Sequence, residues 1–70
     1  MKPTLDYDPE TDSLYIKLRP GASVDNRVVS DDVVIDLGED GEPVGYDIQH
    51  ASRHPEAIAE ALGKLHRRAA

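Results

Sequence analysis

The stretch LDYDPETDSLYIKL, residues 5–18, decides the fold of this chain. Two short runs within it alternate apolar and polar side chains, the period of a half-buried β-strand. The apolar members are Leu5, Tyr7, Leu14, Ile16 and Leu18. Between the runs, Asp8 and Pro9 suit the first two positions of a type I turn, because aspartate supplies a side-chain acceptor and proline a preset φ. The stretch predicts a β-hairpin.

Three more segments, residues 26–30, 33–37 and 44–49, have the composition of strands. In the last two the larger apolar side chains occupy alternate positions, which places them on one face. These are Val33, Ile35, Leu37, Val44, Tyr46 and Ile48. Residues 38–42 form a hairpin loop in which Gly41 suits the left-handed position after a type I turn. The pattern predicts an α+β fold with an antiparallel four- to five-stranded β-meander over residues 4–49.

The C-terminal part changes to the period of a helix. Apolar residues follow the i, i+3, i+4, i+7 spacing of one helix face: Ile58, Ala61, Leu62 and Leu65. Ser52 or His54 is expected to cap the helix, and Pro55 fits its first turn. A helix of about 12 residues is only about 18 Å long and cannot cover a whole sheet. We expect a single domain, residues 1–70, with a C-terminal helix over 53–68 packed on one face of the sheet.

The core available to this chain is small. It has 70 residues, with no Phe, Trp or Cys and only three tyrosines. Domains of this size are marginally stable alone, and those without disulfides or metals often associate instead. We therefore expect a homo-oligomer, most simply a dimer. No run of apolar residues reaches the ~18 that a membrane span needs, and no signal-peptide pattern opens the chain, so the expected location is the cytoplasm.

The charge is acidic but unevenly distributed. Fourteen Asp and Glu against eight Lys and Arg give a formal net charge of −6. This balance argues against a general nucleic-acid binder and is suited to a basic protein partner. The C-terminal part is richer in basic residues, so a DNA-binding autoregulator that uses Arg53, Arg67 and Arg68 is an alternative.

No motif in the sequence identifies a reaction. The alternating acids from Asp6 to Asp12 resemble the start of a calcium loop, but Thr11 and Lys17 stand where such a loop needs Gly and Glu. His50 and His54 have the spacing of a helical metal pair, although Pro55 disfavours helical geometry at the preceding residue. We expect no catalytic residue, no resident metal and no cofactor, and the chain is not expected to be an enzyme. A small ligand- or metal-binding protein remains a further alternative.

A protein-interaction module is the preferred functional interpretation. Tyr15 and Val34 are the larger apolar groups expected on the sheet face away from the helix. Val28 and Val29 are the apolar residues of a short strand expected near an edge. These four side chains are the predicted partner or dimer contacts.

Five segments together resemble the prokaryotic family named domain of unknown function 2283. They are Tyr7–Leu18, Val33–Leu37, Asp40-Gly41, Val44–Ile48 and Ala51-Ser52, in the order of the family pattern and over roughly residues 4 to 53. Gln49 and His50 depart from that pattern, where an apolar and then often an acidic residue stand. The resemblance implies no established activity and no catalytic residues. Some members look like the smaller partner of an RNase-like toxin in two-gene arrangements, which implies an antitoxin-like role for those members.

Overall fold

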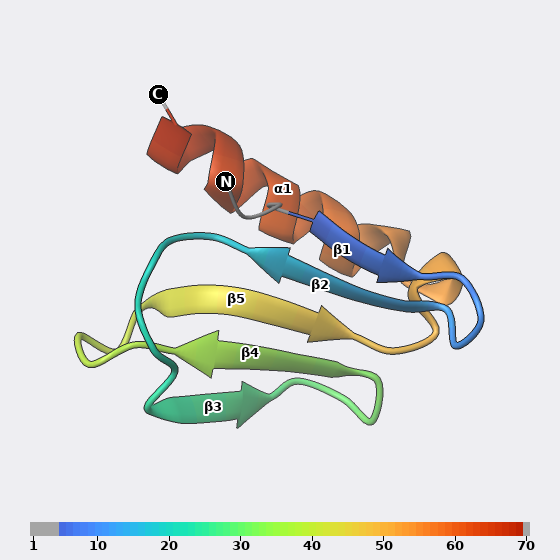
Figure 1. Ribbon diagram of the computed structural model, residues 1–70, viewed down its shortest axis with the longest axis horizontal. Coiled ribbons are helices and arrows are strands. Elements are labelled where there is room, and N and C mark those ends of the chain that lie inside the picture. Colours follow the sequence, from blue (N-terminus) through green and yellow to red (C-terminus); the bar gives the residue numbers. More distant parts are fainter. Residues whose placement is uncertain (1–4, 70) are drawn as a thin grey trace.

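The computed structural model describes the backbone of residues 5–69 and the side chains of residues 5–65. The strands are β1 (Leu5–Asp8), β2 (Ser13–Lys17), β3 (Asp25–Val28), β4 (Val33–Leu37) and β5 (Pro43–Ile48). A 3-10 turn, η1 (Ala51–Arg53), leads into the helix α1 (Pro55–Ala69). The chain therefore has the expected α+β architecture, five antiparallel strands in one sheet with one C-terminal helix (Figure 1).

The strand order corrects the expectation of a simple meander. The order is β1-β2-β5-β4-β3, so β2 and β3 are consecutive in the chain but not neighbours in the sheet (Figure 1). The connection through Pro20 and Gly21 crosses one end of the sheet to reach the opposite edge. β5 takes the central place, where its three large apolar side chains, Val44, Tyr46 and Ile48, are at most 3% exposed.

The first hairpin forms as its turn residues predict. The backbone N–H of Glu10 donates to the Asp8 carboxylate at 3.0 Å, which is the expected Asx turn. Asp12 closes the turn in the left-handed region, with φ of 55°, a conformation that aspartate tolerates better than most residues. Gly41 also adopts the expected left-handed conformation, with φ of 80°.

The core lies between one sheet face and α1. The register aligns Ile16, Tyr46 and Ile35 in one row across β2, β5 and β4, and places Leu14, Ile48 and Val33 in the next. Ile16, Tyr46 and Ile48 are the largest fully buried side chains. From α1, Ala61 is fully buried, and Ala57, Ile58 and Leu65 pack against the same cluster.

Leu62 departs from the expected apolar stripe of the helix, because 40% of its surface is exposed. Consecutive helix positions are separated by about 100°, so a stripe centred on Ala61 leaves Leu62 on its flank. The edge strand β1 is exposed throughout; its Leu5 and Tyr7 share the core face but are 48% and 51% exposed. The helix thus covers the centre of the sheet, as its length predicted, and leaves both edge strands open.

Ser52 does not cap α1. Its hydroxyl donates instead to Asp12, at 2.6 Å. The helix begins at Pro55, and the carbonyl of His54 accepts the backbone N–H groups of Ala57 and Ile58. None of the helices that the structure describes is both long enough and apolar enough to span a membrane.

Candidate functional site

The sheet face opposite α1, called the outer face below, is the main candidate surface. Alternation along each strand sends every second side chain to it. The register forms two rows: Val28, Val34, Asp47, Tyr15 and Asp6 in one, and Asn26, Asp36, Gly45 and Lys17 in the other. Asp8 and Ser13 extend the face at the β1–β2 turn.

The charge of the outer face is strongly one-sided. Among the described residues it carries four carboxylates, Asp6, Asp8, Asp36 and Asp47, against one ammonium, that of Lys17. Lys17 directs its Nζ to the carbonyl of Gly21 at 3.3 Å, at the end of the sheet. Among the ion pairs of the described residues, none joins these four carboxylates to a lysine or arginine. The acidic charge of this face is therefore not compensated within the described part of the chain.

A small hollow of about 160 Å³ lies in this face. Its lining includes Asp6, Asp8 and Asp47, with Ser13 and Tyr15 between them. Asp47 accepts a hydrogen bond from the side-chain amide of Gln49 at 3.0 Å, whereas Asp6 is exposed. Three carboxylates around a shallow concavity suit the tip of a cationic side chain, which would find an opposite charge on several sides.

Tyr15 occupies the middle of the outer face. Its hydroxyl crosses β5 above Gly45 and donates to the carboxylate of Asp36 on β4 at 3.0 Å. Burial, together with this bond and the nearby charges of Asp36 and Asp47, raises the pKa of Tyr15 to about 12. Tyr15 is therefore a neutral donor at physiological pH, fixed against the sheet.

The four predicted contact residues do not form one patch. Tyr15, Val34 and Val28 lie in one row of the outer face. Val29 follows β3 and lies on the other side of the sheet, where it lines a groove beside α1. Val28 and Val29 are the more exposed, at 68% and 57%. Their role in binding remains a prediction.

The groove beside α1 has a volume of about 350 Å³. Its walls are Val29, Ser30, Val33, Tyr46, His54, Glu56, Ala57 and Glu60. Tyr46 donates its hydroxyl to Glu60 at 2.5 Å across it. The groove marks the area over β4 that the helix leaves uncovered.

The structure brings His50 and His54 together through a carboxylate. Asp32 contacts His50 Nδ1 at 3.0 Å and His54 Nε2 at 2.8 Å, and His54 Nδ1 lies 3.3 Å from Glu56. The bond to Asp32, supported by Glu56, raises the pKa of His54, and the bond from His54 lowers the pKa of Asp32. Both ring nitrogens of His54 face carboxylates. Through Asp32, His54 and Glu56, these contacts join the β3–β4 turn to the start of α1.

Asp12 makes the matching connection at the β1–β2 turn. Its carboxylate accepts from the backbone N–H of Ser52 at 3.2 Å and from the Tyr7 hydroxyl at 2.8 Å, in addition to the Ser52 hydroxyl. The bonds from Ser52 and Tyr7 lower the pKa of Asp12.

The described residues contain no group of three or more His, Cys, Asp or Glu side chains that could hold a metal ion.

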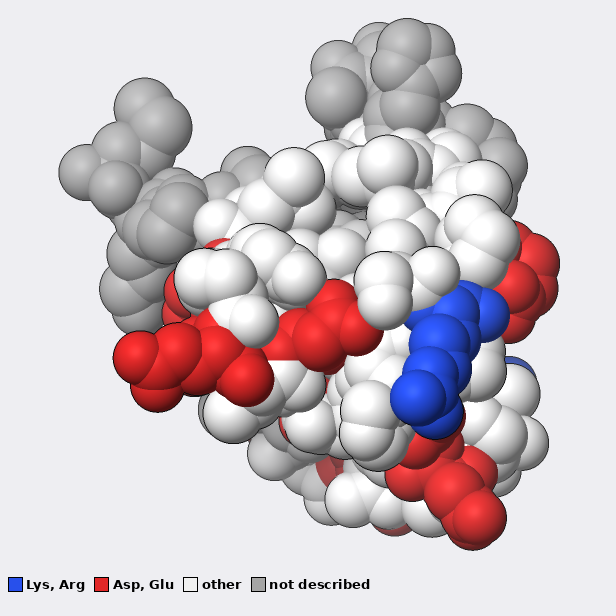
Figure 2. Space-filling model, turned by 90° about the vertical axis from the view of Figure 1, so that its right-hand side faces the viewer, with Lys and Arg blue, Asp and Glu red and all other residues white. Residues whose placement is uncertain are grey.

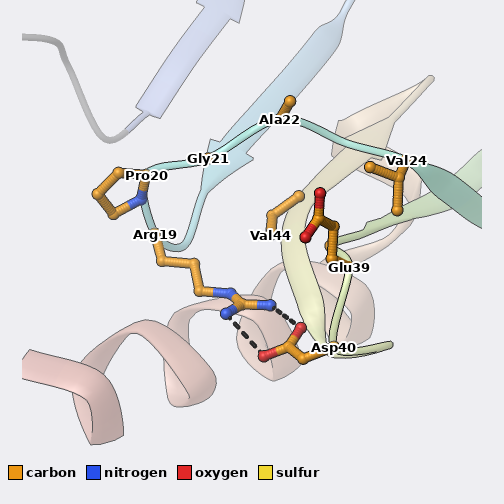
Figure 3. A pocket seen from close by; sticks show the side chains of 9 residues that line it. Arg19, Pro20, Gly21, Ala22, Val24, Glu39, Asp40 and Val44 are labelled. Carbon is orange, nitrogen blue, oxygen red and sulfur yellow. Dashed lines mark hydrogen bonds and ion pairs between the residues drawn. The ribbon is translucent and has the colours of Figure 1, made fainter.

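A further pocket of about 410 Å³ lies at the opposite end of the sheet, between residues 19–24 and 38–40 (Figure 3). Arg19 forms a two-pronged ion pair with Asp40, through Nη1 at 2.9 Å and Nη2 at 2.5 Å. It also donates to the carbonyls of Glu42 and Pro43. The bond from Arg19 lowers the pKa of Asp40 to about 2. Since its guanidinium already has these partners, Arg19 serves to join the two loops.

The predicted nucleic-acid contacts are only partly described. Arg53 is exposed in η1, whereas the side chains of Arg67 and Arg68 lie outside the described residues. On the face drawn in Figure 2, acidic side chains form separate clusters and basic atoms occupy only a narrow strip. The described residues therefore form no continuous basic surface on the face drawn in Figure 2.

The sequence-based interpretation missed the shared location of the outer-face carboxylates. From the sequence, Asp6 and Asp8 are treated only as acids near the first turn, and Asp36 and Asp47 are not grouped with them. The signal was nevertheless present, because each acid stands one position away from a residue of the apolar face. The sequence-based interpretation also missed the pairing of His54 with Asp32, because no rule of sequence spacing predicts such a contact.

Comparison with known proteins adds family membership. The model of the family described as "protein of unknown function (DUF2283)" matches residues 4–52. An uncharacterized protein of Methanocaldococcus jannaschii is 40% identical over 53 residues, which cover 76% of this chain and 45% of that protein. The match thus spans less than half the length of this relative, and no solved structure matches the chain. The family match covers well over half of the chain and includes all five strands; the chain belongs to the DUF2283 family of proteins of unknown function.

Proposed function

We propose that this chain is a protein-interaction module that binds a basic protein partner through the outer face of its sheet. The observation that carries the proposal is the set of four carboxylates on that face, none of which is paired with a lysine or arginine of the described residues. Complementary charge accelerates encounter and selects the partner, and it acts most strongly where the protein does not neutralise it internally.

The hollow between Asp6, Asp8 and Asp47 supports the same proposal. It gives a lysine or arginine of the partner a place to insert, with the ring of Tyr15 beside it. An antitoxin-like role is one instance of this function, since the family resemblance implies it for some members and such a role requires a partner.

The test compares two pairs of substitutions with the same change in net charge. Asp6→Asn with Asp47→Asn removes two of the four carboxylates of the outer face, and Asp31→Asn with Glu39→Gln removes two exposed acids elsewhere. A fluorescent lysine- and arginine-rich peptide serves as the probe, with binding measured by anisotropy at low and high salt. The product of the neighbouring gene, co-expressed with each variant, serves as the candidate partner.

We expect the outer-face pair to weaken peptide binding several-fold at low salt, with a smaller difference at high salt because the charges are screened. The control pair should bind like the wild type. Equal weakening by both pairs would mean that net charge alone attracts the peptide, and this would overturn the proposal.

A further inference from the structure

The two edges of the sheet differ in their charge pattern. β1 and β3 each have a neighbour on one side only and are exposed along their whole length. An open edge presents unpaired backbone groups to another strand. β3 also contains Val28, which is 68% exposed, and is preceded by Val24, which is 57% exposed.

The direction of the free backbone groups of β3 follows from its pairing with β4. The N–H of Val29 donates to the carbonyl of Val33 at 2.9 Å. In an antiparallel ladder, residues whose backbone groups bond to the neighbouring strand alternate with residues whose backbone groups point away from it. Asp25 and Arg27 therefore direct their backbone groups to β4, as Val29 does, whereas Asn26 and Val28 direct theirs outward. The N–H of Asn26 indeed donates to the side chain of Asp25, at 2.8 Å, and not to β4.

The side chains of β3 are complementary to a second copy of the same strand. Asp25 and Arg27 share one face, are exposed, and form no ion pair within the described residues. An antiparallel pairing with its two-fold axis at Asn26 places Arg27 opposite the partner's Asp25 and Asp25 opposite the partner's Arg27. Both pairs occupy non-hydrogen-bonded positions, where side chains approach most closely. The backbone N–H of Val24, just before β3, already donates to the carbonyl of Leu37 at 2.9 Å, so the pairing is limited to the residues of β3 itself.

Other registers and the other edge do not share this complementarity. Moving the axis to Arg27 or to Asp25 places like charges opposite each other. At β1, Asp6 and Asp8 share a face. An axis at Asp6 or at Tyr7 therefore places Asp6 opposite the partner's Asp6 or the partner's Asp8. Like charges directly opposite destabilise a strand pair, which disfavours self-pairing through β1.

We propose that the chain forms a homodimer through antiparallel pairing of β3 with β3 of a second copy, centred on Asn26, which joins the two sheets into one. The two-fold axis is perpendicular to the sheet, so the helices of both copies lie on one side and both outer faces on the other. The proposal does not depend on the acidic outer face, because none of the four carboxylates takes part in the pairing.

Charge exchange tests the register directly. Arg27→Asp alone places aspartates opposite one another, and Asp25→Arg alone places arginines opposite one another. Each single variant should be monomeric, or should dimerise about tenfold more weakly or worse. The double variant Asp25→Arg with Arg27→Asp restores both pairs and should dimerise like the wild type. An equimolar mixture of the two single variants should form the heterodimer. The measurement is sedimentation velocity over a concentration series at physiological salt, with circular dichroism to verify folding.

Asn26→Pro provides a variant that does not depend on charge. It removes an N–H that β4 does not use, so an edge strand tolerates it, and it should abolish dimerisation while leaving the monomer folded. Asp6→Lys on β1 is the control and should leave the dimer unchanged. A wild type that remains monomeric throughout the concentration series would overturn the proposal. The proposal would also be overturned if the Arg27→Asp and Asn26→Pro variants dimerised as the wild type does. A dimer that is altered only by Asp6→Lys on β1 would overturn it as well.

Discussion

The Tyr15 hydroxyl and the Asp36 carboxylate are hydrogen-bonded at 3.0 Å although their strands, β2 and β4, are not neighbours. The contact is possible because Gly45 stands between them on β5 and has no side chain. A Cβ built on Gly45 would meet the hydroxyl and ring carbons of Tyr15. The aromatic ring thus covers the glycine, a pairing that compensates for the side chain the strand lacks.

Gly45→Ala should destabilise the protein because the new methyl group collides with the ring. Insertions into a packed site cost about 1–3 kcal/mol, a large share of the few kcal/mol expected for a domain of this size. Urea unfolding provides the measurement. In a Tyr15→Ala background the same substitution should cost much less, and a double-mutant cycle gives the coupling. If the costs of Gly45→Ala and Tyr15→Ala in the free energy of unfolding were simply additive, the Tyr15 ring would not be the reason why position 45 requires glycine.

Tyr15 should resist ionisation in the folded protein. Its pKa is raised to about 12, so folding favours the neutral phenol. This stabilisation is complete below the ordinary value of 10.0 and is lost as pH rises from 10.0 toward 12. Phenolate absorbance during an alkaline titration should show a step near pH 12 in the folded wild type that the urea-unfolded chain lacks. Tyr15→Phe should remove the late step and leave the other steps in place.

The contact between His54 and Asp32 should make stability depend on pH. The pKa of His54 is raised from 6.5, so its contribution is complete below 6.5 and is lost as pH rises through the raised value. The pKa of Asp32 is lowered from 3.8, so its contribution is lost in acid as pH falls below 3.8 toward the lowered value. His54→Gln should therefore reduce the free energy of unfolding most between these limits and least in alkaline solution.

His50→Gln is the matched control for that experiment. His50 contacts the same carboxylate but its side chain is 54% exposed, against 23% for His54. His50→Gln should have a smaller effect on the free energy of unfolding, because less of this contact is shielded from water. An effect of His54→Gln that is constant from acid to alkaline pH would mean that the ring stabilises by packing and not by charge.

Arg19→Lys should lower stability because lysine cannot form the two-pronged pair with Asp40 and also reach the carbonyls of Glu42 and Pro43. The pKa of Asp40 is lowered from 3.8 to about 2, so the ionic part of this difference is present above 3.8 and lost as pH falls through about 2. Unfolding in urea at several acid pH values measures it. Asp40→Asn removes the charge and should make the cost of Arg19→Lys nearly independent of pH.

The strands could be predicted from sequence because alternation directly reports a half-buried strand. It assigned Ile16, Ile35 and Ile48 to one face, and the register confirms this. Alternation says nothing about which strands are neighbours, so the central place of β5 could not be read from it. That place depends on the summed burial of whole strands, a property of the assembled sheet.

The connections between distant residues were the least predictable part of the site. Ser52 or His54 was expected to cap the helix because local rules consider only nearby backbone groups, whereas the Ser52 hydroxyl binds Asp12, forty positions earlier. The same reason explains why His54 was considered for a metal and not for Asp32. The outer-face acids are an intermediate case. Alternation predicts the face on which they lie, but it does not predict that no lysine or arginine of the described residues pairs with them.

The strand order also determines when the sheet can form. The β1–β2, β3–β4 and β4–β5 ladders each close over a short turn, but β2 pairs with β5, so residue 17 must find residue 45. Closing that long loop costs more chain entropy than the hairpins do, and non-local pairings of this kind slow folding. The hairpins on either side can therefore exist before the centre of the sheet is joined. Until β5 and β2 meet, Ile16 and Tyr46 remain in water.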